Sequence, residues 1–122
     1  MTYDDALAAR VRSLLGDLVD GSGGGPVEEE RLFGGLGFLV AGHMPVCVSG
    51  RGEGLLVRVP EPDGEALVAA SGDTGDVAWM AMGARTARTW VRVADRALVA
   101  DDALASWVER GLAVVRGLPP RR

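Results

Sequence analysis

The sequence predicts one α+β domain, in which an antiparallel sheet of about five strands carries the N- and C-terminal helices. Three observations predict this fold. Apolar residues recur with helical spacing near both ends of the chain, and short apolar runs separated by glycine-rich turns fill the region between them. The 122 residues, 48% hydrophobic and 25% charged, have the length and composition of a single globular domain over 1–122.

The first predicted helix follows from one apolar stripe and from the residues at its two ends. Thr2 and Asp5 are spaced as in a capping box, and Asp4 and Asp5 suit the positive N-terminal end of a helix dipole. The glycine-rich stretch 21–26, expected to be a flexible loop, ends the helix near residues 19–20. The stripe consists of Leu7, Val11, Leu14, Leu15 and Leu18.

Residues 31–59 are predicted to form a three-stranded antiparallel meander. Its first strand is apolar on both faces, which indicates a central strand, and Gly35 and Gly37 on one face would let another backbone approach closely. The short connections at 41–43 and 50–54 favour antiparallel pairing. The predicted strands are residues 31–40, 45–49 and 55–59.

A short helix and a hairpin are predicted after the meander. Pro60 and Pro62 end the third strand, and residues 65–70 form a short helix with Asp63 as its candidate cap. After a loop, two further strands are joined as a hairpin around Gly83, and they are predicted at residues 77–82 and 87–93.

The C-terminal helix has the clearest pattern in the chain. Asp101 and Asp102 at its start and Arg116 at its end match the helix dipole. Gly117 and the two prolines at 119–120 end it. The stripe expected to face the core consists of Leu104, Trp107, Val108, Gly111, Leu112 and Val115.

The charge of the chain is negative overall and uneven along its length. The 13 basic residues, all arginine, and 17 acidic residues give a net charge of −4. Residues 1–30 hold two arginines and seven acids, residues 31–83 three and six, and residues 84–122 eight and four. The whole chain therefore lacks the electrostatic signature of a nucleic-acid-binding protein, and we expect no useful binding of duplex DNA at physiological salt.

The glycine-rich segment Gly34-Gly35-Leu36-Gly37 invites comparison with a phosphate-binding loop. Its spacing matches neither GxGxxG nor the P-loop, and the chain contains no lysine. The segment also lies inside a predicted strand and not at a strand-to-helix junction. A structural role is therefore favoured.

His43 and Cys47 are the single histidine and the single cysteine, so an internal disulfide is excluded. Along an extended strand they are separated by more than about 10 Å, too far for a catalytic dyad. Cys47 is expected to be a small buried apolar side chain. A zinc site would need further ligands that only carboxylates could supply, so no metal, cofactor or catalytic residue is expected.

One cluster stands out: Arg85, Arg88, Trp90 and Arg92 lie in a stretch without acidic residues. On a strand, Arg88, Trp90 and Arg92 would share one face. Such a face can stack on bases, bind an anion or anchor a protein partner. The alternative is a solvent-exposed face on which arginine stems cover the indole.

Several segments resemble the TfoX (Sxy) N-terminal domain family. Residues 30–40 (ERLFGGLGFLV), followed by Gly42-His43-Met44, resemble the family's opening MFGG-x-GF-x-x-x-G-x-M. Residues 55–59 (LLVRV) are similar to its next strand. Residues 82–93 (MGARTARTWVRV) are similar to its segment MGGRPM-x-GW-x-x-V.

The resemblance extends to the C-terminus and covers residues 3–121. Residues 104–108 (LASWV) and 118–121 (LPPR) resemble the family's closing L-x-x-W helix and LPP(K/R) end. The signature positions, which the resemblance implies to be structural, are Phe33, Gly34, Gly35, Gly37, Phe38, Gly42, Met44, Gly83 and Trp107.

The resemblance implies an α+β domain with a non-enzymatic role, because named family members promote natural competence and act as transcriptional co-regulators. We expect a stand-alone, single-domain member that works as a regulatory or protein-interaction module with a protein partner, with a homodimer left open. The N-terminus lacks the features of a signal peptide and no apolar run is long enough for a membrane span, so a cytoplasmic location is expected. Two alternatives remain: a small-ligand or anion-binding domain that uses Arg85, Arg88 and Arg92, and an enzyme that uses Cys47 or His43.

Overall fold

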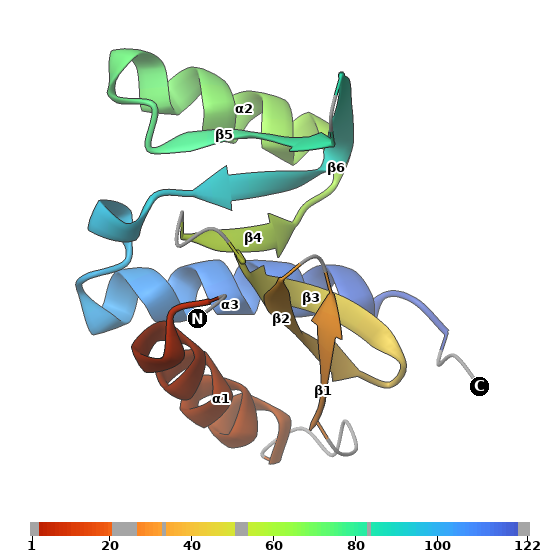
Figure 1. Ribbon diagram of the computed structural model, residues 1–122. Coiled ribbons are helices and arrows are strands. Elements are labelled where there is room, and N and C mark those ends of the chain that lie inside the picture. The colour runs from red at the N-terminus through yellow and green to blue at the C-terminus, as the bar shows by residue number, and fades with distance from the viewer. Residues whose placement is uncertain (1–2, 21–26, 33, 51–53, 83, 120–122) are drawn as a thin grey trace.

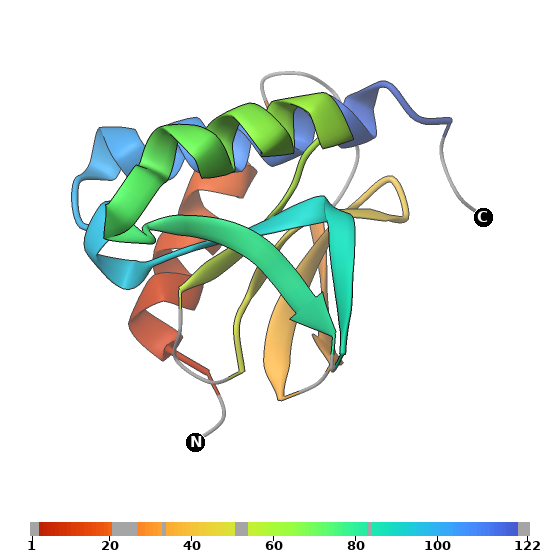
Figure 2. The same cartoon turned by 90° about the horizontal axis from the view of Figure 1, so that it is seen from above.

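The computed structural model describes residues 3–20, 27–32, 34–50, 54–82 and 84–119. Over these residues the chain forms one six-stranded antiparallel sheet and three α-helices, which confirms the predicted α+β fold with six strands in place of about five. All three helices lie on the same side of the sheet (Figure 1, Figure 2). The positions outside the described residues include Thr2, the loop at 21–26, Phe33 and Gly83.

The helices are α1 (Asp5–Asp20), α2 (Glu61–Ser71) and α3 (Asp101–Arg116), and two short 3₁₀ turns are η1 (Gly72–Thr74) and η2 (Asp95–Ala97). The strands are β1 (Val27–Leu32), β2 (Gly35–Val40), β3 (His43–Val48), β4 (Leu55–Arg58), β5 (Val77–Met82) and β6 (Arg85–Val93). They are ordered β1-β2-β3-β4-β6-β5, so the hairpin joins the meander through β6. No described helix combines the length and the apolar character that a membrane span requires.

The prediction of one central strand over residues 31–40 is wrong, because this segment belongs to two strands. β1 and β2 form a hairpin in which Leu32 lies opposite Gly35, and Gly34 in the connection has a φ of 78°. A positive φ is a turn conformation that glycine adopts without steric cost. β1 is an edge strand with its glutamates exposed, whereas β2 is buried beside β3. The apolar central strand is therefore β2 alone.

The close backbone approach expected at the β2 glycines is found at Gly35, whereas Gly37 faces a side chain. A side chain at Gly35 would collide with the backbone carbonyl of Val48, and one at Gly37 would collide with the side chain of Met44. The next connection is the two-residue turn Ala41-Gly42, where φ is 54° and 82°. These angles are those of a type I′ turn, the tight turn that suits the twist of a hairpin.

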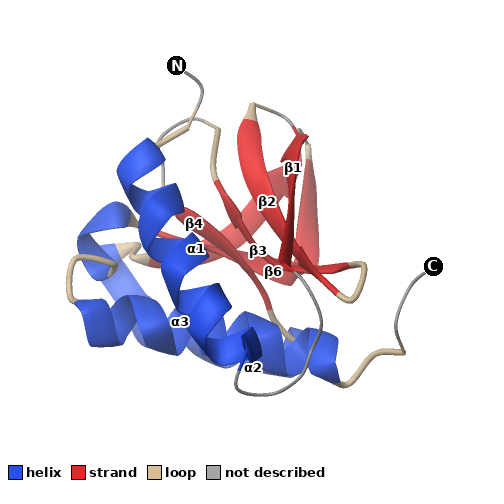
Figure 3. Ribbon diagram, turned by 90° about the horizontal axis from the view of Figure 1, so that it is seen from below, coloured by secondary structure: helices blue, strands red, loops and turns tan. Residues whose placement is uncertain are grey.

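α1 follows its predicted bounds, and Asp4 caps it. The Asp4 carboxylate accepts hydrogen bonds from the backbone N–H groups of Ala6 and Leu7, at 2.9 and 3.1 Å. One side of α1 is buried against the sheet, and Figure 3 shows α1 beside α3 on the helical side. The buried residues are Leu7, Ala8, Val11, Leu15 and Val19, while Leu14 and Leu18 are partly buried against the same core.

α2 is longer than predicted and begins four residues earlier, at Glu61 instead of residue 65. Its N-cap is Pro60, so the predicted cap at Asp63 is wrong. Pro62 lies in the first turn, where a helix needs no backbone N–H donor, so this proline does not interrupt the helix. Gly64 allows α2 to lie close to the sheet, because a side chain there would collide with the indole of Trp79.

β6 is bent by a bulge that the sequence does not reveal. Along the β5–β6 ladder, Trp79 lies opposite Val91, but the next residue, Met80, lies opposite Ala87. Residues 88–90 are therefore extra on the β6 side. From the last residue of the bulge onwards, residues 90–93 pair with β4, so β6 is central at its C-terminal half and pairs with β5 alone at its N-terminal half.

α3 lies across the middle of the sheet and buries its predicted stripe with one exception. Leu104, Val108, Leu112 and Val115 are at most 3% exposed. The exception is Trp107, which was expected in the core but is only half-buried, at the margin of the apolar cluster. Gly111 faces β3, where an added side chain would collide with the Pro45 carbonyl oxygen and crowd Val46.

We predict that Gly111→Ala lowers the free energy of unfolding by about 1–3 kcal/mol, because the added methyl group would push α3 off β3. The matched control is Gly16→Ala in α1, where nothing lies within 4 Å of the added group. Gly16→Ala should be neutral or stabilising by up to about 1 kcal/mol, through helix propensity alone. Denaturant unfolding of both variants measures the difference, and equal stability of the two would contradict the close contact.

Candidate functional site

The predicted Arg/Trp cluster does not form one continuous face. Val91 and Val93 are fully buried in the core beneath the helices, so Trp90 and Arg92, which alternate with them, point to the other side of the sheet. Arg88 lies within the bulge and contacts α2 on the helical side. The prediction that Arg88 shares a face with Trp90 and Arg92 is therefore wrong, because the bulge breaks the alternation.

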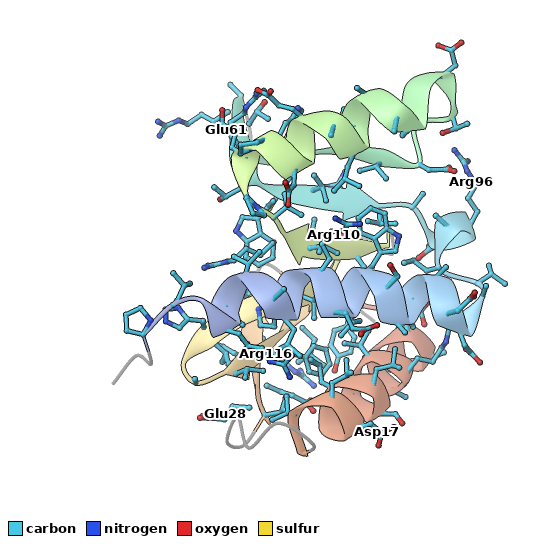
Figure 4. All side chains as sticks on the ribbon, turned by 180° about the vertical axis from the view of Figure 1, so that it is seen from behind. Asp17, Glu28, Glu61, Arg96, Arg110 and Arg116 are labelled. Atoms are coloured by element: carbon cyan, nitrogen blue, oxygen red, sulfur yellow. The ribbon has the colours of Figure 1, made fainter. Side chains whose placement is uncertain are left out.

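Arg88 is held by groups of the helical layer. Its guanidinium carbon lies 4.2 Å from the ring centre of Trp79, which itself packs under α2. Its nitrogens lie 2.7 Å from a carboxylate oxygen of Glu65 and 3.7 Å from one of Glu61. Figure 4 shows Glu61 at the start of α2, beside the β5–β6 hairpin. Arg88 thus ties α2 to the hairpin.

Trp90 is covered by an arginine that the sequence did not single out. Arg58 of β4 lies directly opposite Trp90 in the ladder, and its guanidinium carbon is 5.3 Å from the ring centre of Trp90. This contact depends on β4 being the neighbour of β6, a pairing that strand patterns alone do not predict. The other tryptophans are covered likewise, Trp79 by Arg88 and Trp107 by Arg110 at 5.4 Å.

None of the described helices covers the opposite side of the sheet, which we call the helix-free face. Strand alternation and register assign Cys47 and Leu56 to its centre, where both are less than 10% exposed. Gly37, opposite Cys47, is also buried, and the other residues of this face are half-buried or exposed. The helix-free face consists of Gly37, Leu39, Cys47, Leu56, Arg58, Ala78, Met80, Trp90 and Arg92.

A surface depression of about 410 Å³ lies at one end of β5 and β6. Of the candidate arginines, only Arg92 lines it, and Asp95 is another of its lining residues. Burial, and secondarily the charge of Asp4, raise the pKa of Asp95. The arginines therefore do not converge on this depression, and an anion bound there would face a carboxylate. Its lining residues are Gly75, Ala78, Arg92, Ala94 and Asp95.

Cys47 and His43 make separate contacts. Cys47 is 6% exposed, as expected, and its thiol lies 3.6 Å from the Val48 carbonyl oxygen. Burial raises the pKa of this thiol to about 11, which disfavours the thiolate. His43 lies 2.6 Å through its Nε2 from the carbonyl oxygen of Pro119 in the C-terminal segment. Among the described residues, no three histidine, cysteine or acidic side chains gather as metal ligands.

Three arginines of the basic C-terminal segment, Arg88, Arg96 and Arg116, contact other parts of the chain. Arg96 bonds to the carboxylate of Asp76, and Figure 4 shows it at the far end of α2 from Glu61. Arg116 donates to the carbonyl oxygen of Leu18 at 3.2 Å. Together with the Arg88 pairs, these contacts set positive charge from residues 84–122 against the acidic part of the chain. These three arginines therefore do not gather into one basic surface.

We predict that Cys47 reacts slowly with alkylating reagents in the folded protein. A pKa near 11 leaves about hundredfold less thiolate at neutral pH than an exposed cysteine has, and burial blocks access as well. Labelling with and without denaturant measures the protection. Rapid reaction of the native protein would contradict the buried position.

The raised pKa of Cys47 also predicts how the stability of the protein depends on pH. The thiol pKa is higher in the folded than in the unfolded chain, so unfolding releases this proton between the two values. The free energy of unfolding should be unaffected by Cys47 below about pH 8 and should fall as the pH rises from about 8.5 towards about 11. Cys47→Ala should remove this part of the pH dependence, and an unchanged profile in that variant would contradict the assignment.

A comparison with known protein families assigns the chain to a family. The family model described as TfoX N-terminal domain matches residues 18–115, which is most of the chain. No curated protein and no solved structure matches the chain. The match includes the β1–β2 hairpin, the type I′ turn with Met44 behind it, and Trp107 on α3. The chain therefore belongs to the TfoX N-terminal domain family.

Proposed function

We propose that this domain is a non-enzymatic regulatory module that binds a protein partner through the helix-free face, centred on Trp90. The observation that carries the proposal is the one-sided covering of the sheet. Three helices bury one face, while Trp90, Arg58 and Met80 on the other remain partly exposed. Tryptophan, arginine and methionine are enriched in protein–protein interfaces, and tryptophan and arginine most often carry their binding energy.

The geometry supports the alternative functions less well. An anion-binding site would need several converging arginines, but Arg88 is paired with acids of α2 and Arg92 shares its depression with Asp95. A cysteine enzyme would need an accessible thiolate, but burial keeps Cys47 protonated. A duplex-binding surface would need a basic patch, but Arg88 and Arg96 face acids of the same chain.

The experiment compares two tryptophan variants as bait in affinity capture from the native host. Trp90→Ala removes the indole of the helix-free face. Trp107→Ala is the matched control, because Trp107 is also half-buried and arginine-covered but lies on α3, in the helical layer. We expect to capture a partner that has the same affinity for Trp107→Ala as for the wild type. Its affinity for Trp90→Ala should be lower by a factor of about ten or more.

The comparison needs folded variants, and two outcomes would contradict the proposal. Circular dichroism and denaturant unfolding must show both variants folded before their binding is compared. Equal loss of the partner from both variants would move the contact away from Trp90. Micromolar affinity of the wild type for duplex DNA at physiological salt, lost when Arg88 and Arg92 are changed to glutamate, would replace the protein-partner proposal with direct DNA binding.

A further inference from the structure

The two edges of the sheet differ in how they are protected against pairing with another strand. An edge strand exposes unpaired backbone groups, and charged side chains are a common protection. β1, at one edge, has the sequence VEEERL, and its three glutamates and Arg31 are exposed. β5, at the other edge, has the sequence VAWMAM and carries no charge. Charged side chains therefore protect the β1 edge but not the β5 edge.

The outer backbone of β5 is protected at one residue. The Ser71 hydroxyl lies 3.3 Å from the N–H and 3.2 Å from the carbonyl oxygen of Val77, so both groups of Val77 point away from β6. Because backbone direction alternates along a strand, the N–H and C=O groups of Trp79 and Ala81 point to the same outer edge. Within the described residues, no strand other than β6 pairs with β5. In Figure 2 no other element crosses in front of β5.

We propose that the chain forms a two-fold symmetric homodimer in which β5 pairs antiparallel with β5 of a second copy, centred on Met80. In this register Trp79 lies opposite the partner's Ala81, and Ala81 lies opposite the partner's Trp79. Each of these two pairs exchanges two backbone hydrogen bonds, which uses the outer groups that Ser71 leaves open. The two sheets become one continuous sheet across the dimer axis.

Charge at the two ends of β5 favours a second copy over an unrelated strand. Asp73 in η1 precedes β5, and Arg85 follows it at the start of β6. Both are exposed, and neither forms an ion pair with any other residue that the structure describes. Antiparallel two-fold pairing places Asp73 of each copy at the same end as the partner's Arg85. The edge is therefore self-complementary, as a two-fold interface requires.

The first test removes one outer donor. Ala81→Pro deletes the N–H that points away from β6 and leaves the β5–β6 ladder in place. Its matched control, Ala81→Thr, keeps the N–H and suits a strand. In sedimentation equilibrium we expect the wild type and Ala81→Thr to reach twice the 12.7 kDa mass of one chain. Ala81→Pro should dimerise about tenfold to a hundredfold more weakly.

The second test exchanges the charges. Asp73→Arg and Arg85→Asp each place like charges at both ends of the interface, and each should weaken the dimer about threefold to tenfold at low salt. The double variant restores opposite charges and should restore the wild-type dimer. Because these are exposed positions, the exchange stays informative even if Ala81→Pro fails to fold.

Three results would overturn the proposal: a wild type that stays monomeric at millimolar concentration, a folded Ala81→Pro that dimerises like the wild type, or a double charge variant as weak as the single ones. Met80 belongs to the helix-free face as well, but Trp90 lies on β6, outside the β5–β5 pairing, so Trp90→Ala should weaken partner binding and leave the dimer intact. Failure of the dimer proposal can therefore be distinguished from failure of the partner proposal.

Discussion

The architecture depends on how closely α3 can approach the centre of the sheet. Gly111 removes the side chain at the point where the helix meets the Pro45 carbonyl, so the helix backbone rests almost directly on β3. This contact lets Leu104, Val108 and Leu112 reach the core residues of the central strands, where dispersion and burial of apolar surface are largest. α1 then packs beside α3, and α2 occupies the remaining area over β5 and β6. The three described helices thus form one layer over a single core, and none of them covers the opposite face of the sheet.

Arginine is the residue that joins the layers at their margins. Arg12 of α1 holds Glu29 of β1 through two hydrogen bonds of 2.5 and 2.8 Å, and Arg88 joins the hairpin to α2 in the same way. The bond from Arg12 lowers the pKa of Glu29. Each pair is exposed and stabilises the fold only slightly. The Arg88 pairs in addition place a cation of the basic segment 84–122 beside two acids of the preceding segment 31–83.

Periodicity and turn chemistry predicted most of the fold, because α1, α3, the meander and the hairpin each carry a local pattern. The features that these patterns missed depend on single backbone angles or on pairing between strands that are far apart in the sequence. The positive φ of Gly34 divides an apolar run that reads as one strand, and Pro62 reads as a break although it lies in the first turn of α2. At the candidate site, Trp90 and Arg92 could be placed on one face, but the bulge that displaces Arg88 leaves no trace in the alternation. Arg58 could not be found, since its contact with Trp90 requires the β4–β6 pairing.

The bulge at residues 88–90 also has a consequence for how the sequence can change over time. It separates β6 into a part whose register is set by the core, at Val91 and Val93, and a part that pairs only with β5. A one-residue insertion or deletion in a regular strand would reverse the facing of every residue beyond it. Here the bulge absorbs such a change before it reaches the buried valines. The tip of the hairpin can therefore acquire or lose residues in evolution while the interior of the domain is left undisturbed.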